Sequence, residues 1–122
     1  MNAASQVYDA AVIGGGPAGL TAAIALAATG AKTALLARRV PYADNRTTAL
    51  LGASTDLLER LDVWPRCRDK AAALRTMRLV DDTGRLIRAP EVRLTSEEIG
   101  LEQFGYNIEN RVLLAALEER AA

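Results

Sequence analysis

The chain has 122 residues, of which half are apolar and a quarter are charged. A chain of this length accommodates at most one domain, and the composition is typical of an ordinary globular protein. Fifteen basic residues balance fifteen acidic ones, so no net electrostatic field favours nucleic acid or an anionic membrane surface. Histidine is absent, which excludes histidine-based catalytic triads and most zinc sites.

The single cysteine, Cys67, provides neither a disulfide framework nor a Cys-x-x-Cys site, and this pattern fits a reduced cytoplasmic compartment. Residues 1–6 have neither the basic start nor the long apolar segment of a targeting sequence. The longest apolar stretch is interrupted by the glycines and proline of residues 14–19. We therefore expect a cytoplasmic location, no transmembrane segment and no metal site.

Residues 7–39 carry the strongest signal in the chain. An apolar strand is expected over residues 7–13, a glycine-rich turn over residues 14–19, a helix over residues 17–29 and a second apolar strand over residues 32–37. The turn has the spacing G-x-G-x-x-G. Between two such strands this spacing predicts a Rossmann-like βαβ unit that binds a dinucleotide.

Each glycine of this fingerprint has an expected role. Gly14 lets the chain leave the strand in a tight turn, Gly16 lets the backbone approach a pyrophosphate, and Gly19 lets the helix lie close to the strand. Pro17 suits the first helical position, where no amide donor is required. Unpaired amides and the positive end of the helix dipole then face the phosphates. The expected pyrophosphate site consists of Gly14, Gly15, Gly16, Pro17, Ala18 and Gly19.

The end of the second strand lacks one expected feature. Sites of this kind usually place Asp or Glu there to bind the ribose 2′-hydroxyl, but this chain has Ala37 followed by Arg38. One alternative is that Arg38 binds a 2′-phosphate, which indicates NADP. The other is that backbone, water or an arginine holds the ribose of a different dinucleotide, and these residues alone leave both alternatives open.

The next segment is expected to be a loop followed by a helix. Pro41 and the Asp-Asn pair favour a loop over residues 40–45. Residues 46–50 are expected to lead into a helix with leucines at helical spacing as far as Leu61, and Ser54 is expected to cap its main part. Residues 63–65 should end this helix, with a short turn or helix up to Ala73.

A β-hairpin is expected next. Residues 77–80 and residues 85–88 are extended apolar segments on either side of the turn at residues 81–84, where Gly84 permits a positive φ. Asp81 and Asp82 are interpreted as residues of this turn and not as catalysts.

The C-terminal part combines short elements with a final helix. A short helix is expected to begin at residues 96–98, and residues 106–109 look extended. Asn110 is expected to cap the last helix. Its apolar face comprises Val112, Leu113, Ala116 and Leu117.

The chain therefore contains only two of the parallel strands that a mononucleotide-binding half requires, because such a half needs a third. The last helix should be the crossover to that strand. We expect an α/β fold consisting of a Rossmann-like βαβ unit with an added β-hairpin, truncated before the third parallel strand. Residues 1–122 would then be the N-terminal portion of a dinucleotide-binding domain in a larger protein.

Three stretches together resemble a known family: DAAVIGGGPAGLTAAIALAATGAKTALLARR, DNRTTALLGASTDLLERLDVWP and GYNIENRVLLAAL. In order and spacing they are similar to the flavin-dependent aromatic hydroxylases of ubiquinone biosynthesis (2-polyprenyl-6-methoxyphenol hydroxylase-like), within the para-hydroxybenzoate hydroxylase-like group. The first stretch is common to many FAD and NAD proteins. The Arg-Thr-Thr-Ala-Leu segment and the following helix that ends in Leu-x-x-Trp are much more restricted to this subgroup.

The resemblance implies that the dinucleotide is FAD, bound by this chain as part of an FAD-binding domain. Arg46, with Thr47 beside it, would reach the flavin cofactor, and Arg111 would contact the ribityl–pyrophosphate region. Arginines suit a diphosphate because they are planar, permanently charged donors. The chain departs from the family at Ala37, where the family usually has Glu, so Arg38 or backbone is expected to compensate at the adenosine ribose.

The resemblance also implies an activity for the full-length protein. Members of the family use NAD(P)H as a transient reductant and O2 to hydroxylate a phenolic ring, here a polyprenylated ubiquinone precursor. Peripheral membrane or multi-subunit association is compatible with such a substrate. No catalytic residue is assigned within the 122 residues, and the chain alone is expected to be inactive.

Two other classes compete with this interpretation. A flavin disulfide reductase, an amine oxidase or a similar FAD/NAD(P)-dependent oxidoreductase is disfavoured, because no Cys-x-x-Cys follows the fingerprint and the Arg-Thr-Thr-Ala-Leu segment is foreign to those groups. A non-catalytic, truncated flavin-binding module is the second alternative, and the chain length supports it.

Overall fold

The computed structural model describes residues 6–38 and 44–122. Its N-terminal part is the predicted βαβ unit, formed by β1 (Ala10–Ile13), α1 (Pro17–Ala28) and β2 (Thr33–Leu36). The two strands are parallel, with β1 and β2 in register from end to end. The prediction of these three elements is confirmed, although both strands are shorter than expected.

Helix α1 begins and ends as the sequence predicts. Gly16 is its N-cap, Pro17 occupies the first helical position, and Gly30 follows the helix with φ 89°. Pro17 is tolerated there because this position has no intrahelical amide bond to lose, and Gly30 accepts the left-handed conformation without a steric cost. The buried residues of α1 include Leu20 and Ile24, so this helix presents its apolar side to the core.

A second, antiparallel sheet consists of β3 (Thr47–Leu51), β4 (Ala72–Leu74) and β7 (Gly105–Glu109), with β7 in the centre. The expectation that residues 46–50 lead into a helix is confirmed by α2 (Gly52–Arg60), but the sequence did not predict that most of these residues themselves form strand β3. The β-branched residues at its start favour a strand, and pairing with β7 provides backbone partners along the whole segment.

Helix α2 (Gly52–Arg60) follows β3 directly. The predicted cap at Ser54 is wrong, because Ser54 lies inside the helix and Leu51 is the N-cap, without a side-chain hydrogen bond. Two short 3-10 turns, η1 (Trp64–Arg66) and η2 (Arg68–Lys70), come next. Strand β4 then occupies the end of the segment that was expected to be a turn or helix, because it pairs with β7.

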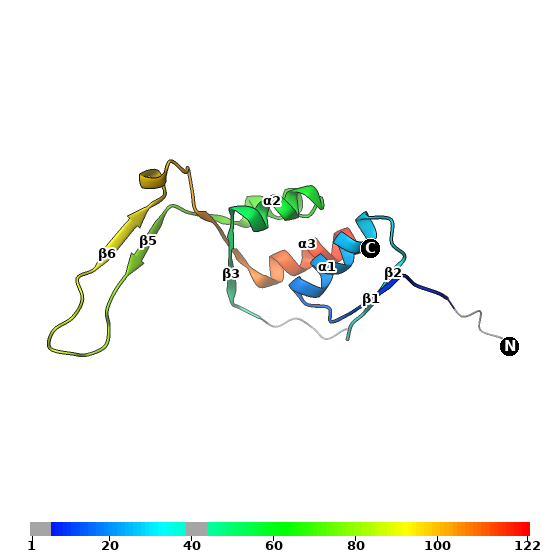
Figure 1. The fold of residues 1–122 in the computed structure, drawn as a ribbon, viewed down its shortest axis with the longest axis horizontal. Coiled ribbons are helices and arrows are strands. Elements are labelled where there is room, and N and C mark those ends of the chain that lie inside the picture. Colours follow the sequence, from blue (N-terminus) through cyan, green and yellow to red (C-terminus); the bar gives the residue numbers. More distant parts are fainter. Residues whose placement is uncertain (1–5, 39–43) are drawn as a thin grey trace.

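The predicted hairpin is present, but one of its two strands was placed wrongly. Strand β5 (Thr76–Leu79) pairs with β6 (Val92–Thr95) and not with residues 85–88. The Asp81 carboxylate accepts hydrogen bonds from the amides of Thr83 and Ala89, so the turn extends into a longer loop. Figure 1 shows this hairpin projecting away from the helices.

The C-terminal elements begin with the predicted short helix, η3 (Ser96–Ile99), which a capping box of Thr95 and Glu98 stabilises. Helix α3 (Asn110–Ala121) follows β7. The predicted cap at Asn110 is wrong, since Glu109 is the N-cap and makes no side-chain cap bond. The Asn110 side chain instead accepts a hydrogen bond from the Thr48 hydroxyl and donates one to Asp44 over 3.0 Å.

The core lies where the three helices meet the central strand β7. Helices α1 and α3 lie side by side, and α2 lies above them in Figure 1. The Trp64 and Tyr106 rings are 5.1 Å apart, which adds an aromatic contact to the aliphatic packing. The most deeply buried side chains are those of Ile108, Leu117, Val63, Cys67 and Ser96.

The predicted loop over residues 40–45 lies outside the described residues at positions 40–43, as do residues 1–5 and Arg39. Among residues 6–38 and 44–122, no helix is both long and apolar enough to cross a membrane.

Gly105 provides a test of the antiparallel sheet. A Cβ atom on Gly105 would lie 2.0 Å from the Leu50 carbonyl oxygen, whereas one on Gly52 would meet nothing within 4 Å. We expect Gly105→Ala to lower the free energy of unfolding by about 1–3 kcal/mol, the range of overpacking changes, in a urea titration. Gly52→Ala is the matched control and should leave it nearly unchanged. Equal stability of the two variants would contradict the close approach of β3 and β7.

Candidate functional site

The glycine-rich turn is held by two close contacts between its backbone and the adjacent elements. Gly14 has φ 121°, a conformation that residues with a side chain rarely adopt. Its amide donates to the Leu36 carbonyl over 2.9 Å, which ties the turn to the end of β2. A Cβ on Gly19 would lie 2.0 Å from the Gly14 carbonyl oxygen. The structural roles predicted for Gly14 and Gly19, a tight turn and close helix packing, are therefore confirmed.

Gly16 differs from these two because nothing in the protein requires it to be glycine. Its φ and ψ are −80° and 177°, which any residue can adopt, and a Cβ there would meet nothing within 4 Å. The space beside Gly16 is therefore open. The adjacent first turn of α1 has amides without intrahelical partners and the positive end of the helix dipole, so this open space favours an anion.

A hollow of about 1350 Å³ lies beside the turn. The ends of β1 and β2, the turn itself and one face of α3 form its walls. Its lining residues are Ile13, Gly14, Gly15, Gly16, Leu20, Leu35, Leu36, Ala37, Arg38, Leu114, Glu118, Ala121 and Ala122. Three of the predicted pyrophosphate-site residues thus share one hollow with the two residues predicted at the ribose.

Gly15 has a role that the sequence reasoning did not assign. A Cβ on Gly15 would lie 2.6 Å from the Cβ of Ala37, so the turn and the end of β2 pack directly against each other here. Ala37 and Arg38 are both exposed. The predicted ribose position is therefore accessible from the hollow and lies next to the glycine-rich turn.

The residues that α3 contributes to the hollow were also missed. Leu114, Glu118 and Ala121 lie on one side of α3 and face the hollow. In the sequence they have only the i, i+4, i+7 spacing of an ordinary helix face, and nothing in that pattern distinguishes the wall of a binding site from a core surface. Their placement depends on the packing of α3 beside α1, which is a tertiary feature.

Arg46 and Thr47 lie at the start of β3, beside the end of β7 that leads into α3. Neither residue lines this hollow. The Arg46 side chain is 81% exposed and forms an ion pair with Asp44 at 2.8 Å. Its carbonyl accepts a hydrogen bond from the Asn110 amide over 3.0 Å, and Thr47 is opposite Glu109 in the sheet. This pairing places Arg46 next to the beginning of α3.

Arg111 lies at that beginning and pairs with Glu109. The hydrogen bond from Arg111 lowers the pKa of the Glu109 carboxyl, and the same contact raises the pKa of Arg111. Arg111 lines a second, smaller hollow of about 550 Å³ on the neighbouring face of α3, together with Arg66 and Lys70. Arg46 and Arg111 thus form a second group of candidate residues, at the point where the start of β3 lies beside the start of α3 and outside the lining of the first hollow.

The two groups differ in their chemistry. The hollow beside the glycine-rich turn presents backbone amides, small residues and one arginine, which fits a phosphate-bearing ligand with a long apolar or aromatic part. Arg46 and Arg111 are both paired with carboxylates, which reduces the net positive charge that each side chain presents to an anion. Among the described residues, no group of three or more Cys, Asp or Glu is arranged to hold a metal ion.

Comparison with protein families gives one match, which spans residues 7–121 and is described as FAD binding domain. The match covers both groups of candidate residues. No curated protein sequence matches the chain.

Several solved structures have a similar fold. The flavin-dependent monooxygenase PieE, in complex with FAD and substrate, has a TM-score of 0.70 and 22% identity over 93% of this chain. A variant of 2-methyl-3-hydroxypyridine-5-carboxylic acid oxygenase has a TM-score of 0.68 and 24% identity over 95% of the chain. The p-nitrophenol 4-monooxygenase PnpA from Pseudomonas putida DLL-E4 has a TM-score of 0.68 and 17% identity over 91% of the chain. The chain spans only 22%, 29% and 28%, respectively, of the lengths of these three proteins.

The different surroundings of Gly19 and Gly16 provide a prediction. We expect Gly19→Ala to lower the free energy of unfolding by about 1–3 kcal/mol, because the added methyl group must displace the Gly14 carbonyl. Gly16→Ala is the matched control, and it should cost less than about 1 kcal/mol, the usual difference between Gly and Ala at an N-cap. Urea denaturation of both variants measures the difference, and a Gly16→Ala variant that is the less stable of the two would contradict this geometry.

Proposed function

The chain belongs to the FAD binding domain family, and on that premise we propose that it is the FAD-binding, N-terminal portion of a flavin-dependent monooxygenase. The observation that carries the proposal is the open space at Gly16 beside the first turn of α1. A glycine that the fold itself does not require is explained by a ligand that must approach the backbone closely.

The residues around that space fit the diphosphate of FAD. The amides of the first turn of α1 provide donors, and no acidic residue occupies that turn. The hollow of about 1350 Å³ extends from the turn towards Ala37 and Arg38. This direction suits the adenosine half of the ligand, with the ribose near Ala37 and Arg38 as a positively charged neighbour.

We assign the remaining predicted residues to the other half of the cofactor. Arg46, Thr47 and Arg111 would adjoin the flavin and ribityl side, and their carboxylate partners Asp44 and Glu109 would orient the guanidinium groups. The flavin supplies the redox chemistry when it is bound. This chain's own residues bind and orient it, and none of the described residues is assigned a proton transfer.

A finer proposal concerns the reaction of the whole protein. We propose NAD(P)H as reductant, O2 as co-substrate and a phenolic, polyprenylated ubiquinone precursor as substrate, in the cytoplasm or at the membrane periphery. The support for this subgroup is the Arg-Thr-Thr-Ala-Leu segment at residues 46–50 and the Leu-x-x-Trp segment that ends at Trp64. A longer polypeptide with these first 122 residues would contribute the substrate pocket, since the three similar structures are about three to five times longer, as their coverage implies.

The second candidate is a flavin-binding module without turnover. The observation in its favour is that the candidate residues bind and orient a cofactor but include no proton-transfer group near the hollow other than Glu118, at the far end of α3. Oxidation of NADH or NADPH in the presence of FAD and O2 separates the two candidates, because the module would bind the flavin without consuming reductant.

The first test is a titration of the purified chain with FAD. We expect binding to shift the visible absorbance bands of the flavin, and we expect Gly16→Ala to weaken it by at least about tenfold, a change of about 1.4 kcal/mol, because the methyl group occupies the space of the diphosphate. NADP, added alone in a parallel titration, is the competing ligand suggested by Arg38. A chain that binds NADP and not FAD would overturn the proposal.

The second test concerns the missing ribose acid. Ala37 is exposed and lines the hollow, so in Ala37→Glu the new carboxylate can accept a hydrogen bond from a ribose hydroxyl. One such bond is worth about 1 kcal/mol, and we expect FAD to bind about fivefold more tightly. Ala22→Glu, an exposed position on α1, is the control for the added charge. Equal FAD affinity of the Ala37→Glu variant and the wild type would show that Ala37 does not lie at the ribose.

A further inference from the structure

Helix α2 ends in a left-handed residue that is not glycine. The Asp62 amide donates to the Glu59 carbonyl over 3.0 Å, and the Val63 amide donates to the Leu58 carbonyl over 2.9 Å. These two bonds define a Schellman motif, whose left-handed position glycine usually occupies. Asp62 has φ 59° and is the only non-glycine residue with a positive φ among residues 6–38 and 44–122. The turn alone does not explain why this left-handed position is occupied by aspartate and not by glycine.

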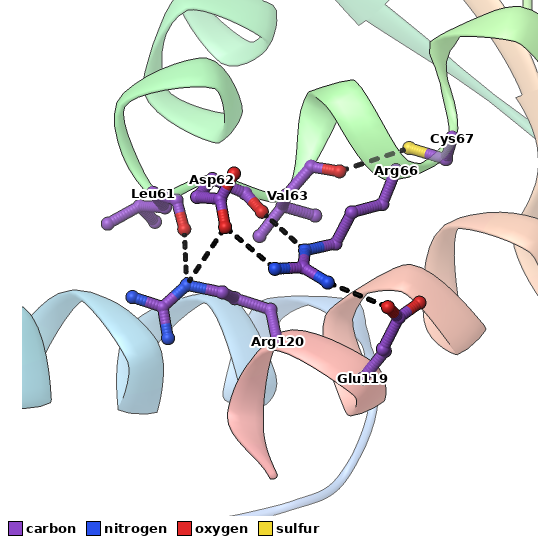
Figure 2. Close-up of polar contacts among 7 residues, drawn as sticks. All are labelled: Leu61, Asp62, Val63, Arg66, Cys67, Glu119 and Arg120. Carbon is purple, nitrogen blue, oxygen red and sulfur yellow. Dashed lines mark hydrogen bonds and ion pairs between the residues drawn. The ribbon is translucent and has the colours of Figure 1, made fainter.

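The Asp62 carboxylate explains the exception, because it begins a polar chain that reaches α3 (Figure 2). Arg66 Nη2 is 2.7 Å from Asp62 Oδ2, and Arg66 Nε donates to the Asp62 carbonyl over 2.7 Å. The same guanidinium group donates through Nη1 to Glu119 of α3, also over 2.7 Å. Arg66 thus uses three of its donors to join the corner after α2 to the last turn of α3.

A second arginine, Arg120, also joins α3 to the corner after α2, and here the donor belongs to α3. Arg120 of α3 donates through Nε to the Leu61 carbonyl over 2.9 Å and lies 4.0 Å from the Asp62 carboxylate. The Leu61 carbonyl is at the C-terminal end of α2, where the helix dipole favours a cation. Two consecutive residues of α3 are therefore held at one corner of the fold, shown at the centre of Figure 2.

The last turn of α3 also forms part of the wall of the hollow. Glu118 and Ala121 line the hollow beside the glycine-rich turn, while Glu119 and Arg120 are held at the corner. Successive residues of a helix are about 100° apart around its axis. Contacts that hold Glu119 and Arg120 at the corner therefore also set the direction in which Glu118 and Ala121 point. Leu117 is fully buried and anchors the preceding turn, so the corner controls the last turn in particular.

We propose that Asp62 is a positioning residue for the dinucleotide hollow: through Arg66 it holds Glu119, and thereby the last turn of α3, in the place where Glu118 and Ala121 form the hollow's wall. The inference rests on the proposed FAD site. It assigns Asp62 no contact with the ligand.

Asp62→Gly tests this role because it separates backbone stability from side-chain positioning. Glycine suits the left-handed conformation better than aspartate, so the corner should retain its fold. The hydrogen bond from Arg66 Nε to the backbone carbonyl of residue 62 remains, while the contacts of the carboxylate with Arg66 and Arg120 are lost. Glu119→Ala removes the acceptor for Arg66 from the α3 side, and Asp62→Asn keeps a hydrogen-bond acceptor and tolerates the left-handed conformation. Arg78→Gln is the control, since it breaks the exposed Arg78–Glu91 pair of the hairpin, which lies outside the hollow.

The measurements are the FAD dissociation constant, the urea midpoint and amide hydrogen exchange over residues 118–122. We expect Asp62→Gly and Glu119→Ala each to weaken FAD binding by about three- to tenfold and to speed exchange in this segment, with a nearly unchanged urea midpoint. The two effects should be less than additive in the double variant, because both substitutions remove a partner of the Arg66 guanidinium group. Asp62→Asn should recover part of the affinity, and Arg78→Gln should match the wild type.

The failures of the two proposals are distinguishable. If the wild type binds FAD and Asp62→Gly binds it equally well, or if the two single effects simply add, the positioning role is wrong while the FAD site stands. If the wild type binds no FAD, the proposed function fails, and unchanged hydrogen exchange in Asp62→Gly would then overturn the link between the corner and α3 independently.

Discussion

The structure depends on the contact between the Gly19 position and the Gly14 carbonyl, where no atom larger than hydrogen fits. This contact brings the first turn of α1 against the end of β1. It therefore determines where the unpaired amides of that turn point. It also fixes the position of Gly16 and of the open space beside it, whereas the opposite wall of the hollow comes from α3. A packing constraint thus creates the electrostatic property that an anion recognises.

The antiparallel sheet performs a different task, which is to bring distant parts of the chain to the start of α3. Asn110 joins Thr48 and Asp44 through its side chain, and its backbone amide donates a hydrogen bond to the Arg46 carbonyl. Because these contacts fix the strand that carries Arg46 beside the helix that carries Arg111, the two arginines belong to one structural unit. The β3–β7 pairing and the contacts of Asn110 thus bring two segments that are distant in the sequence to the start of α3.

The sequence predicted the βαβ unit well because its signals are local. A glycine spacing, a proline at the first helical position and apolar runs of the right length need no tertiary information. Strand β3 could not be predicted, because leucines at positions 50, 57 and 58 fit helical spacing and the partner that makes the segment a strand is β7, about 60 residues away. The hairpin partner was misplaced for a related reason, because Asp81 closes a longer loop than the turn residues indicate. The α3 wall of the hollow could not be predicted, since it depends on how two helices pack.

The charge distribution around the candidate site favours recognition by backbone over recognition by side chains. Arg46 and Arg111 are each neutralised by an adjacent carboxylate, and the chain as a whole carries no net charge. A site that relied on arginine charge would attract many anions and would depend strongly on salt. The first-turn amides of α1 instead select by shape, because a ligand must fit into the space at Gly16 to reach them.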